Sequence, residues 1–308
     1  MANDERMRRA RQRRLGGEGA PIVIDGGMGT ELEKRGVRMD SKAWSGVAVL
    51  EQPAVVRQVH EDFIAAGAEV IITNTFSSAR HMLEPAGYGK HVEAINREAV
   101  ALARAAVKRQ GGPPVAVAGS ICEWTTADGS KWSTPDAVAR SITEQATILA
   151  TAGVDLIALE MCQDPPYTVP AVDAAMSTGL PVWIGVSCRS RPGVAKLPVF
   201  DYTDKTFEAL VASVSSLSPE CINIMHSPVP DVAPAIDLLK TVWSGPIGVY
   251  PESGYFKMPN WQFVDVIEPA DLARQAERWL SRGVRLFGGC CGLGVEHVRA
   301  LSEVARAA

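Results

Sequence analysis

Two adjacent cysteines give this sequence its strongest chemical feature. Cys290 and Cys291 lie in GVRLFGGCCGLGVEHVRAL, inside a glycine-rich turn that follows a short apolar run. Two thiols on such a turn can both reach one metal ion, and thiolate ligands favour zinc, which they bind at about 2.3 Å in tetrahedral geometry. The residues alone leave two other interpretations open, a strained vicinal disulfide or a pair of small buried side chains.

The segments that must position these thiols alternate, from Pro21 onward, between short β-branched runs and longer helical patterns. This alternation predicts βαβ units around a parallel sheet. Glycine ends the helical patterns in AAGAEV, TAGVDL and SRGVRL, as expected of a left-handed position after a helix C-terminus. Eight candidate strands, each followed by a candidate helix, predict an α/β fold of the closed (β/α)8 TIM barrel type; they span residues 22–25, 69–73, 115–118, 155–160, 182–187, 221–225, 247–250 and 285–288.

The longest connections follow strands, at residues 26–51, 119–135, 188–204 and 251–269. In a barrel these loops form the C-terminal rim, where active sites are assembled. No linker divides the chain, so residues 20–308 are expected to form a single barrel. The Arg-rich segment 1–19, MANDERMRRARQRRLGGEG, is expected to be a poorly ordered, solvated tail.

Composition narrows the class of partner. The chain has 308 residues, 46% of them hydrophobic, and a formal net charge of −4 with basic and acidic side chains intermixed, which argues against a nucleic-acid partner. No apolar stretch approaches the roughly 18 to 20 residues that cross a bilayer, so we expect a cytoplasmic protein without a membrane partner. The six cysteines are too few for a disulfide framework in a chain of this length. Small-molecule substrates are therefore expected, and a homo-oligomer is left open.

Several motifs resemble a known family, the zinc- and thiol-dependent homocysteine S-methyltransferases, which include the betaine-homocysteine enzymes and the homocysteine domain of cobalamin-dependent methionine synthase. The resemblance covers nearly the whole chain after residue 19. It implies transfer of a methyl group to the thiol of homocysteine, giving methionine, on a Zn²⁺ ion that binds and ionises the acceptor sulfur. The motifs are DGGMGTELEKRG at 25–36, AGAEVIITNTF at 66–76, NREAVALAR at 96–104, AGSI at 118–121, ADGS at 127–130, GVDLIALEM at 153–161 and GGCCG at 288–292.

The resemblance implies three zinc ligands, and the third position departs from the family pattern. Family members carry a cysteine at the end of the sixth strand, in a pattern like GINCSP, whereas this chain has CINIMHSP with His226 at the matching place. Imidazole is a common zinc ligand, so the expected ligands are Cys290, Cys291 and His226. Cys221 lies five residues earlier, about 16 Å along a strand and on the opposite face. A hydrogen-bonded histidine without a metal remains the alternative for His226.

The exchange of a thiolate for an imidazole has a chemical consequence. Two thiolates and one neutral imidazole on zinc give zero net charge instead of −1, so the bound acceptor sulfur should be less nucleophilic. This favours a reactive donor or an acceptor other than homocysteine. Met161 stands where betaine-type members have a tyrosine, which favours a sulfonium donor such as S-methylmethionine, and YPESGYF departs from the family's YPN-type sequence at Glu252.

The resemblance also assigns rim residues to the substrates. Asp25 and Glu160 are the expected catalytic-site carboxylates, with Glu160 pairing with the substrate ammonium; a structural N-cap or a loop salt bridge is the alternative for both. Aromatic faces hold onium groups, and Trp44 and Phe76 are the preferred candidates among the rim aromatics, which also include Trp124, Trp132 and Tyr255. The expected substrate-binding residues are Gly26, Gly27, Thr73, Asn74, Thr75, Glu160, Trp44 and Phe76.

Two other functions remain to be separated from methyl transfer. A divergent barrel of the same family could bind a different thiol or serve regulation, and the departures at His226 and Glu252 favour this alternative. A zinc hydrolase is less consistent with the sequence, because such barrels usually carry His-x-His with further histidines, whereas this chain has five histidines and none so spaced.

Overall fold

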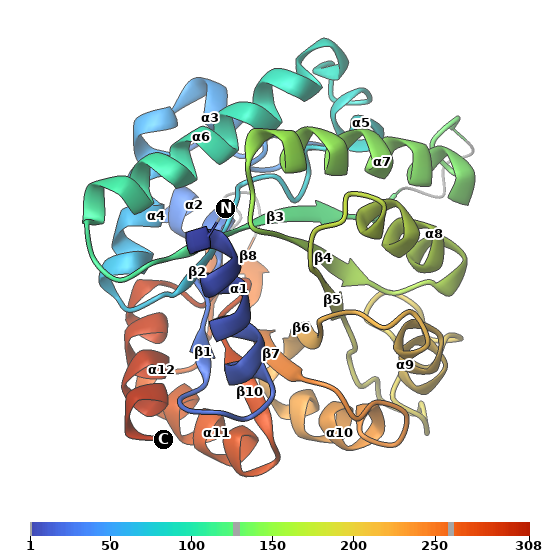
Figure 1. Cartoon of the computed structure of the whole chain (residues 1–308). Helices are drawn as coiled ribbons and strands as arrows, with labels where there is room; N and C mark the ends of the chain where they lie inside the picture. Colours follow the sequence, from blue (N-terminus) through green and yellow to red (C-terminus); the bar gives the residue numbers. More distant parts are fainter. Residues whose placement is uncertain (1, 126–129, 258–261) are drawn as a thin grey trace.

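Eight parallel strands form one sheet that closes into a barrel (Figure 1). The computed structural model describes residues 2–125, 130–257 and 262–308. The strand order is β1-β10-β7-β6-β5-β4-β3-β2, and an isolated bridge between Ile24 and Val70 joins the two end strands. The predicted (β/α)8 barrel is confirmed. Its strands are β1 (Ile22–Val23), β2 (Val70–Ile72), β3 (Ala116–Cys122), β4 (Leu156–Cys162), β5 (Val182–Val186), β6 (Cys221–Pro228), β7 (Ile247–Glu252) and β10 (Val284–Phe287).

Helices surround the barrel and return the chain from the end of each strand to the start of the next (Figure 1). The glycines predicted to end helices, Gly67, Gly153 and Gly283, have φ values of 108°, 96° and 88°, as that position requires. The helices after β1 are α2 (Met28–Lys34), α3 (Ala48–Glu51) and α4 (Pro53–Ala65); the others are α5 (Arg80–Leu83), the 3-10 helix η1 (Gly89–His91), α6 (Val92–Gln110), α7 (Pro135–Ala152), α8 (Pro165–Met176), α9 (Phe207–Ser215), α10 (Val229–Leu239), α11 (Pro269–Ser281) and α12 (Val295–Ala307).

Apolar side chains fill both faces of the sheet. One cluster packs the helices against the outside of the strands and includes Phe63, Phe207 and Trp279. A second cluster fills the barrel interior and includes Trp183, Tyr250 and Leu286. Because strand residues alternate between these two clusters, the side chains that point inward near the strand ends must face the mouth of the barrel.

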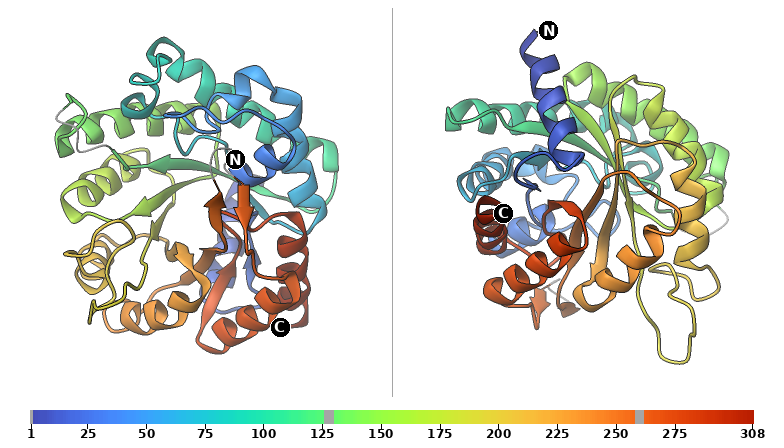
Figure 2. Two further views of the ribbon diagram at one scale, coloured as in Figure 1. Left: turned by 180° about the vertical axis from the view of Figure 1, so that it is seen from behind. Right: turned by 60° about the horizontal axis from the view of Figure 1, so that its bottom comes forward.

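The N-terminal segment differs from the expected poorly ordered tail. Residues Ala2–Leu15 form helix α1, which lies across one end of the barrel (Figures 1 and 2). Leu15 is 2% exposed and belongs to the interior cluster. Arg11 pairs with Glu220 at 3.1 Å and Arg14 with Glu69 at 2.8 Å, both just before strands. A single leucine and paired arginines therefore hold α1 against the N-terminal ends of the strands.

The opposite end of the barrel carries the long loops that follow the strands (Figure 2). A short antiparallel hairpin, β8 (Tyr255–Lys257) with β9 (Gln262–Val264), lies between β7 and α11. Residues 127–129 of the ADGS motif lie outside the described residues. No helix among the described residues has the length and apolar character needed to cross a membrane. The cytoplasmic location and the oligomeric state stay predictions.

Candidate active site

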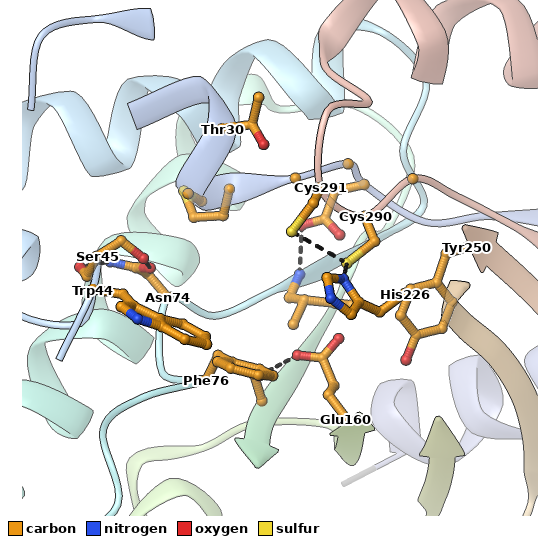
Figure 3. Close-up of a pocket in the computed structure, with 18 of the residues that line it drawn as sticks. Thr30, Trp44, Ser45, Asn74, Phe76, Glu160, His226, Tyr250, Cys290 and Cys291 are labelled. Atoms are coloured by element: carbon orange, nitrogen blue, oxygen red, sulfur yellow. Dashed lines mark hydrogen bonds between the residues drawn. The ribbon is translucent and has the colours of Figure 1, made fainter. Parts of the chain in front are cut away.

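Cys290, Cys291 and His226 converge at the mouth of the barrel (Figure 3). Their ligand atoms all lie within 4.8 Å of one another, and no other group of this kind occurs in residues 2–125, 130–257 and 262–308. The Cys290 sulfur is 3.5 Å from Nδ1 of His226 and 4.0 Å from the Cys291 sulfur. Ligands about 2.3 Å from a tetrahedral zinc lie about 3.8 Å apart, so the donor atoms and their spacing fit a zinc ion.

The local backbone explains how two distant segments bring these side chains together. Cys290 and Cys291 follow β10, and the Cys290 amide donates to the carbonyl of Pro251 at 2.8 Å, which ties the cysteine turn to β7. His226 lies near the end of β6 with a φ of 43°, where the pairing of β6 with β7 shifts register. A left-handed residue other than glycine is uncommon inside a strand, and here the distortion turns the imidazole toward the thiols.

The geometry of the cysteine pair differs from that of a vicinal disulfide and from that of two small buried side chains. All six cysteines are free, and the 4.0 Å between the two sulfurs excludes a vicinal disulfide in this structure. Cys290 and Cys291 are partly exposed to the cavity, whereas Cys221 is fully buried in the barrel interior and lies apart from the site, as expected. Neighbouring Cys291 and burial raise the pKa of Cys290, so metal binding there must release a proton.

His226 is enclosed by a carboxylate and an aromatic ring. Nδ1 lies 3.4 Å from Oε2 of Glu252, and the ring of Phe200 lies 4.5 Å from the imidazole. Arg189 forms an ion pair with Glu252 and also lies over Phe200, 3.8 Å from its centroid. Burial lowers the pKa of His226, but the adjacent Cys290 and Glu252 outweigh burial, and the pKa is raised above its ordinary value.

The two expected carboxylates lie in the same cavity, close enough to affect one another. Glu160, at 8% exposure, accepts hydrogen bonds from the hydroxyls of Ser120 and Tyr250, yet burial raises its pKa to about 7. Oδ2 of Asp25 accepts the amide of Ile72 at 2.7 Å, and burial, with a contribution from the charge of Glu160, raises the pKa of Asp25. Neither carboxylate has a basic side chain as an ion-pair partner among the described residues. A ligand cation would favour the ionised forms of both.

The predicted glycines and polar residues divide into two groups. Gly26, Gly27, Thr73 and Asn74 line the cavity, and a Cβ on Gly27 would lie 2.5 Å from the Cys290 carbonyl oxygen, so this position has room only for glycine. Thr75 does not reach the cavity. It is fully buried, and its hydroxyl donates to the Ser120 carbonyl at 2.7 Å, which makes it a support for β3.

An aromatic wall borders the cavity on the side away from Tyr250 (Figure 3). Trp44 and Phe76 both line the cavity and stack with centroids 5.5 Å apart and planes at 11°. The ring centroid of Trp124 lies 5.9 Å from that of Trp44, but Trp124 does not line the cavity. Trp132 and Tyr255 do not line it either, and Tyr255 is 57% exposed. Of the five candidate aromatics, the two preferred ones are therefore the two at the cavity.

Apart from Met161, which was singled out as bearing on the choice of donor, the other lining residues were not anticipated from the sequence. Strand alternation could have indicated several, since Ser120, Met225 and Tyr250 share the inward face with predicted residues or with the interior cluster. Others come from loops and could not be placed by periodicity. The cavity measures about 220 Å³, and its additional lining residues are Met28, Gly29, Thr30, Glu33, Met39, Ser45, Ile72, Ser120, Met161, Met225, Tyr250, Phe263 and Gly289.

Known proteins resemble this chain over almost its whole length. Residues 22–305 match the family model described as homocysteine S-methyltransferase. Homocysteine S-methyltransferase 4 of Zea mays is 28% identical, with 94% of this chain and 91% of the relative covered. Selenocysteine methyltransferase of Astragalus bisulcatus is 26% identical, with 93% of each chain covered.

A bacterial relative and a bacterial crystal structure are also similar to this chain. Homocysteine S-methyltransferase YbgG of Bacillus subtilis is 27% identical over 92% of this chain and 94% of the relative. The crystal structure of the Escherichia coli homocysteine methyltransferase MmuM in its metallated form superposes with a TM-score of 0.73 at 24% identity, covering 94% of this chain and 98% of that one, and supports the fold. Since the family model spans the barrel from its first strand to its last helix, the chain belongs to the homocysteine S-methyltransferase family of enzymes.

Proposed function

We propose that this protein is a zinc-dependent S-methyltransferase that moves a methyl group from a sulfonium donor, with S-methylmethionine favoured, to the thiol of homocysteine or a closely related thiol. With homocysteine the product is methionine. The observation that carries the proposal is the convergence of Cys290, Cys291 and His226 at one edge of a cavity that also holds a pair of buried carboxylates and an aromatic wall. Each of these three features suits one part of the reaction.

Zinc held by these three ligands would keep its fourth coordination position for a substrate sulfur. Zinc held by these residues would lower the pKa of an acceptor thiol from about 8.5, so that the sulfur is a thiolate at neutral pH. Both thiol ligands must also ionise, since the thiolate is the form that binds metal. Metal affinity should therefore fall steeply as the pH is lowered.

The protein's remaining groups bind and orient the two reactants. The carboxylates of Glu160 and Asp25 line the cavity, where the ammonium of an amino-acid acceptor would offset the burial that raises their pKa values. Trp44 and Phe76 offer ring faces to a sulfonium. In the transfer, the acceptor sulfur forms a bond to the methyl carbon while the carbon–sulfur bond of the donor breaks, and that electron pair leaves the donor as a neutral thioether. Holding both partners in line is the main contribution of the cavity.

Metal content and methyl transfer of matched cysteine variants test the proposal. We expect the purified protein to bind one zinc per chain and to methylate homocysteine from S-methylmethionine, and Cys290→Ser or Cys291→Ser to lose both properties. Cys221→Ser, at a buried cysteine outside the site, is the control and should retain zinc. Unchanged zinc content in both site variants would refute the metal assignment.

A panel of acceptors and donors separates the proposal from the alternatives. Homocysteine and selenocysteine should be compared as acceptors because relatives carry the names of enzymes for each, and betaine should be compared with sulfonium donors. Firmly bound zinc without transfer from any donor would favour a binding or regulatory barrel. Peptide or amide hydrolysis would favour a zinc hydrolase.

A further inference from the structure

The aromatic wall is built from two loops that follow different strands. Trp44 lies in the connection after β1, and Phe76 lies in the connection after β2. Their rings nevertheless stack, with centroids 5.5 Å apart and planes at 11°. Because the two rings belong to separate loops, the wall keeps this geometry only if the loops are held against one another.

The turn that carries Trp44 has an unusual backbone. Trp44 has a φ of 47°, in the left-handed region that bulky residues rarely adopt and that persists only where surrounding contacts hold it. Its amide donates to the Asp40 carbonyl at 3.1 Å, and its carbonyl accepts the Asp40 amide at 2.9 Å. Oδ1 of Asp40 accepts the amides of Lys42 and Ala43, each at 2.8 Å. These contacts fix the shape of the turn but not its place relative to Phe76.

The side chain of Asn74 connects the two loops beside the stacked rings. Its Nδ2 donates to the Ser45 carbonyl at 2.7 Å, and its Oδ1 accepts the Ser45 hydroxyl at 2.9 Å. Asn74 is 4% exposed, and it lies with Ser45, Trp44 and Phe76 on the side of the cavity away from Tyr250 (Figure 3). Both polar atoms of the Asn74 amide are therefore engaged by the residue that follows Trp44.

A second contact between the same loops lies on the other side of Trp44. The Ser77 hydroxyl donates to the Ala43 carbonyl at 2.5 Å. The loops also pack closely here, since a Cβ on Gly46 would lie 2.8 Å from the Ser77 hydroxyl oxygen. Ala43 and Ser45, the two neighbours of Trp44 in sequence, are thus both bonded to the loop that carries the other ring.

We propose that Asn74 is a positioning residue that clamps the Trp44 turn to the loop of Phe76 and so holds the aromatic wall for the methyl donor. This inference rests on the donor site of the proposed function. An aromatic face attracts a cation only within about 6 Å of the ring centroid, and a wall that is already fixed loses little freedom when the donor binds. Since the Asn74 amide is engaged by Ser45, Asn74 acts through Trp44 and not by direct contact with the acceptor.

The KM values for the two substrates test this role. Asn74→Ala should raise the KM for S-methylmethionine by about 2- to 10-fold, the range of one net hydrogen bond, and change the KM for homocysteine by less than about two-fold. Ser45→Ala removes only the hydroxyl contact and should act in the same direction by a smaller factor. Asn96→Ala is the matched control, because this buried asparagine donates to the carbonyls of Ser78 and Val92 at 2.8 Å without lining the cavity; it should lower Tm with no selective rise in the KM for the donor.

The same substitution in a Trp44→Ala background distinguishes positioning from direct contact with the donor. There, Asn74→Ala should change the KM for S-methylmethionine by less than about two-fold, because no ring is left to hold. An undiminished effect in that background, or an equal rise of both KM values in Asn74→Ala alone, would overturn the positioning role. If Asn74→Ala does not fold, Ser45→Ala is carried through the same comparison.

Hydrogen exchange of residues 40–46, followed by mass spectrometry, tests the clamp without turnover. Exchange in this segment should be faster in Asn74→Ala than in the wild type, while exchange in α6 stays the same. Unchanged exchange at 40–46 and an unchanged KM for the donor, in a protein where Trp44→Ala does raise that KM, would refute the clamp alone. A wild-type KM for the donor in Trp44→Ala would instead refute the donor site of the proposed function, and with it the role of the clamp in donor binding.

Discussion

Replacing Glu160 by glutamine should stabilise the metal-free protein at alkaline pH while removing acceptor binding. The side chain is 8% exposed, and burial raises its pKa from an ordinary 4.5 to about 7 despite hydrogen bonds from Ser120 and Tyr250. The folded protein therefore retains a proton on Glu160 that the unfolded chain releases near pH 4.5. Between these two values the folded state binds more protons, so the stability contributed by protonated Glu160 is present at low pH and is lost as the pH rises to about 7.

The size of the effect follows from the two pKa values. The interval from 4.5 to about 7, at about 1.4 kcal/mol per pH unit, corresponds to about 3 kcal/mol of unfolding free energy. Measurements at about pH 5 and about pH 8 span most of that pH interval, so the change in unfolding free energy between them should be about 2 to 3 kcal/mol. Glutamine carries no charge at either pH. The difference in stability between Glu160→Gln and the wild type should therefore grow in favour of the variant by about 2 to 3 kcal/mol over this range.

Urea unfolding of the two metal-free proteins at both pH values measures this difference. Glu208→Gln is the matched control for the loss of a carboxylate, because Glu208 is 54% exposed in a surface ion pair with Lys196. If Glu160 binds the acceptor ammonium, the KM for homocysteine should also rise as the pH falls below about 7 in the wild type, since only the ionised carboxylate pairs with a cation. A stability difference that does not change with pH would refute the conclusion that Glu160 is a buried acid of raised pKa.

Three further substitutions test other parts of the structure. Leu15→Ala should lower the unfolding free energy by about 2 to 5 kcal/mol in a urea titration, because this side chain closes the barrel interior, whereas a loss near zero would mean that α1 is not docked. Gly185→Ala should cost about 1 to 3 kcal/mol, measured as a fall in Tm, and lower kcat, because its Cβ would lie 2.6 Å from Cγ of Met225 and 2.8 Å from the Tyr250 hydroxyl; an unchanged Tm would contradict this packing. Trp44→Ala should raise the KM for S-methylmethionine by about 10-fold and leave the KM for homocysteine nearly unchanged in steady-state assays, whereas equal effects on both would argue against a donor site at this wall.

Local sequence patterns were sufficient to predict the barrel and the positions of its rim. Each of the eight expected strands overlaps an observed one, because short β-branched runs and helix-ending glycines depend on residues that are close in sequence. Alternation along β4 gives Glu160 the same inward face as Leu156 and Ala158, which belong to the interior cluster. The cysteine pair followed from a single turn, since two adjacent thiols remain neighbours in almost any conformation of that turn.

Contacts between distant segments could not be predicted in this way. The helix α1 had too few apolar residues to indicate burial, and only the folded barrel brings Glu69 and Glu220 to its arginines. Thr75 was assigned to the substrate by its neighbours in sequence, but the fold directs its hydroxyl to the Ser120 carbonyl.

Residue types and their order along the chain were enough to identify the two thiols, the inward carboxylates and the alternation of strands and helices that brings them to one rim. How these groups are held depends on the folded barrel, because direction and protonation depend on neighbours from other strands. The raised pKa of Glu160 comes from burial within the closed barrel, and the neighbours of His226, Glu252 and Phe200, come from other segments of the chain. Burial and charge pairing are properties of packed groups, and no spacing along the chain specifies them.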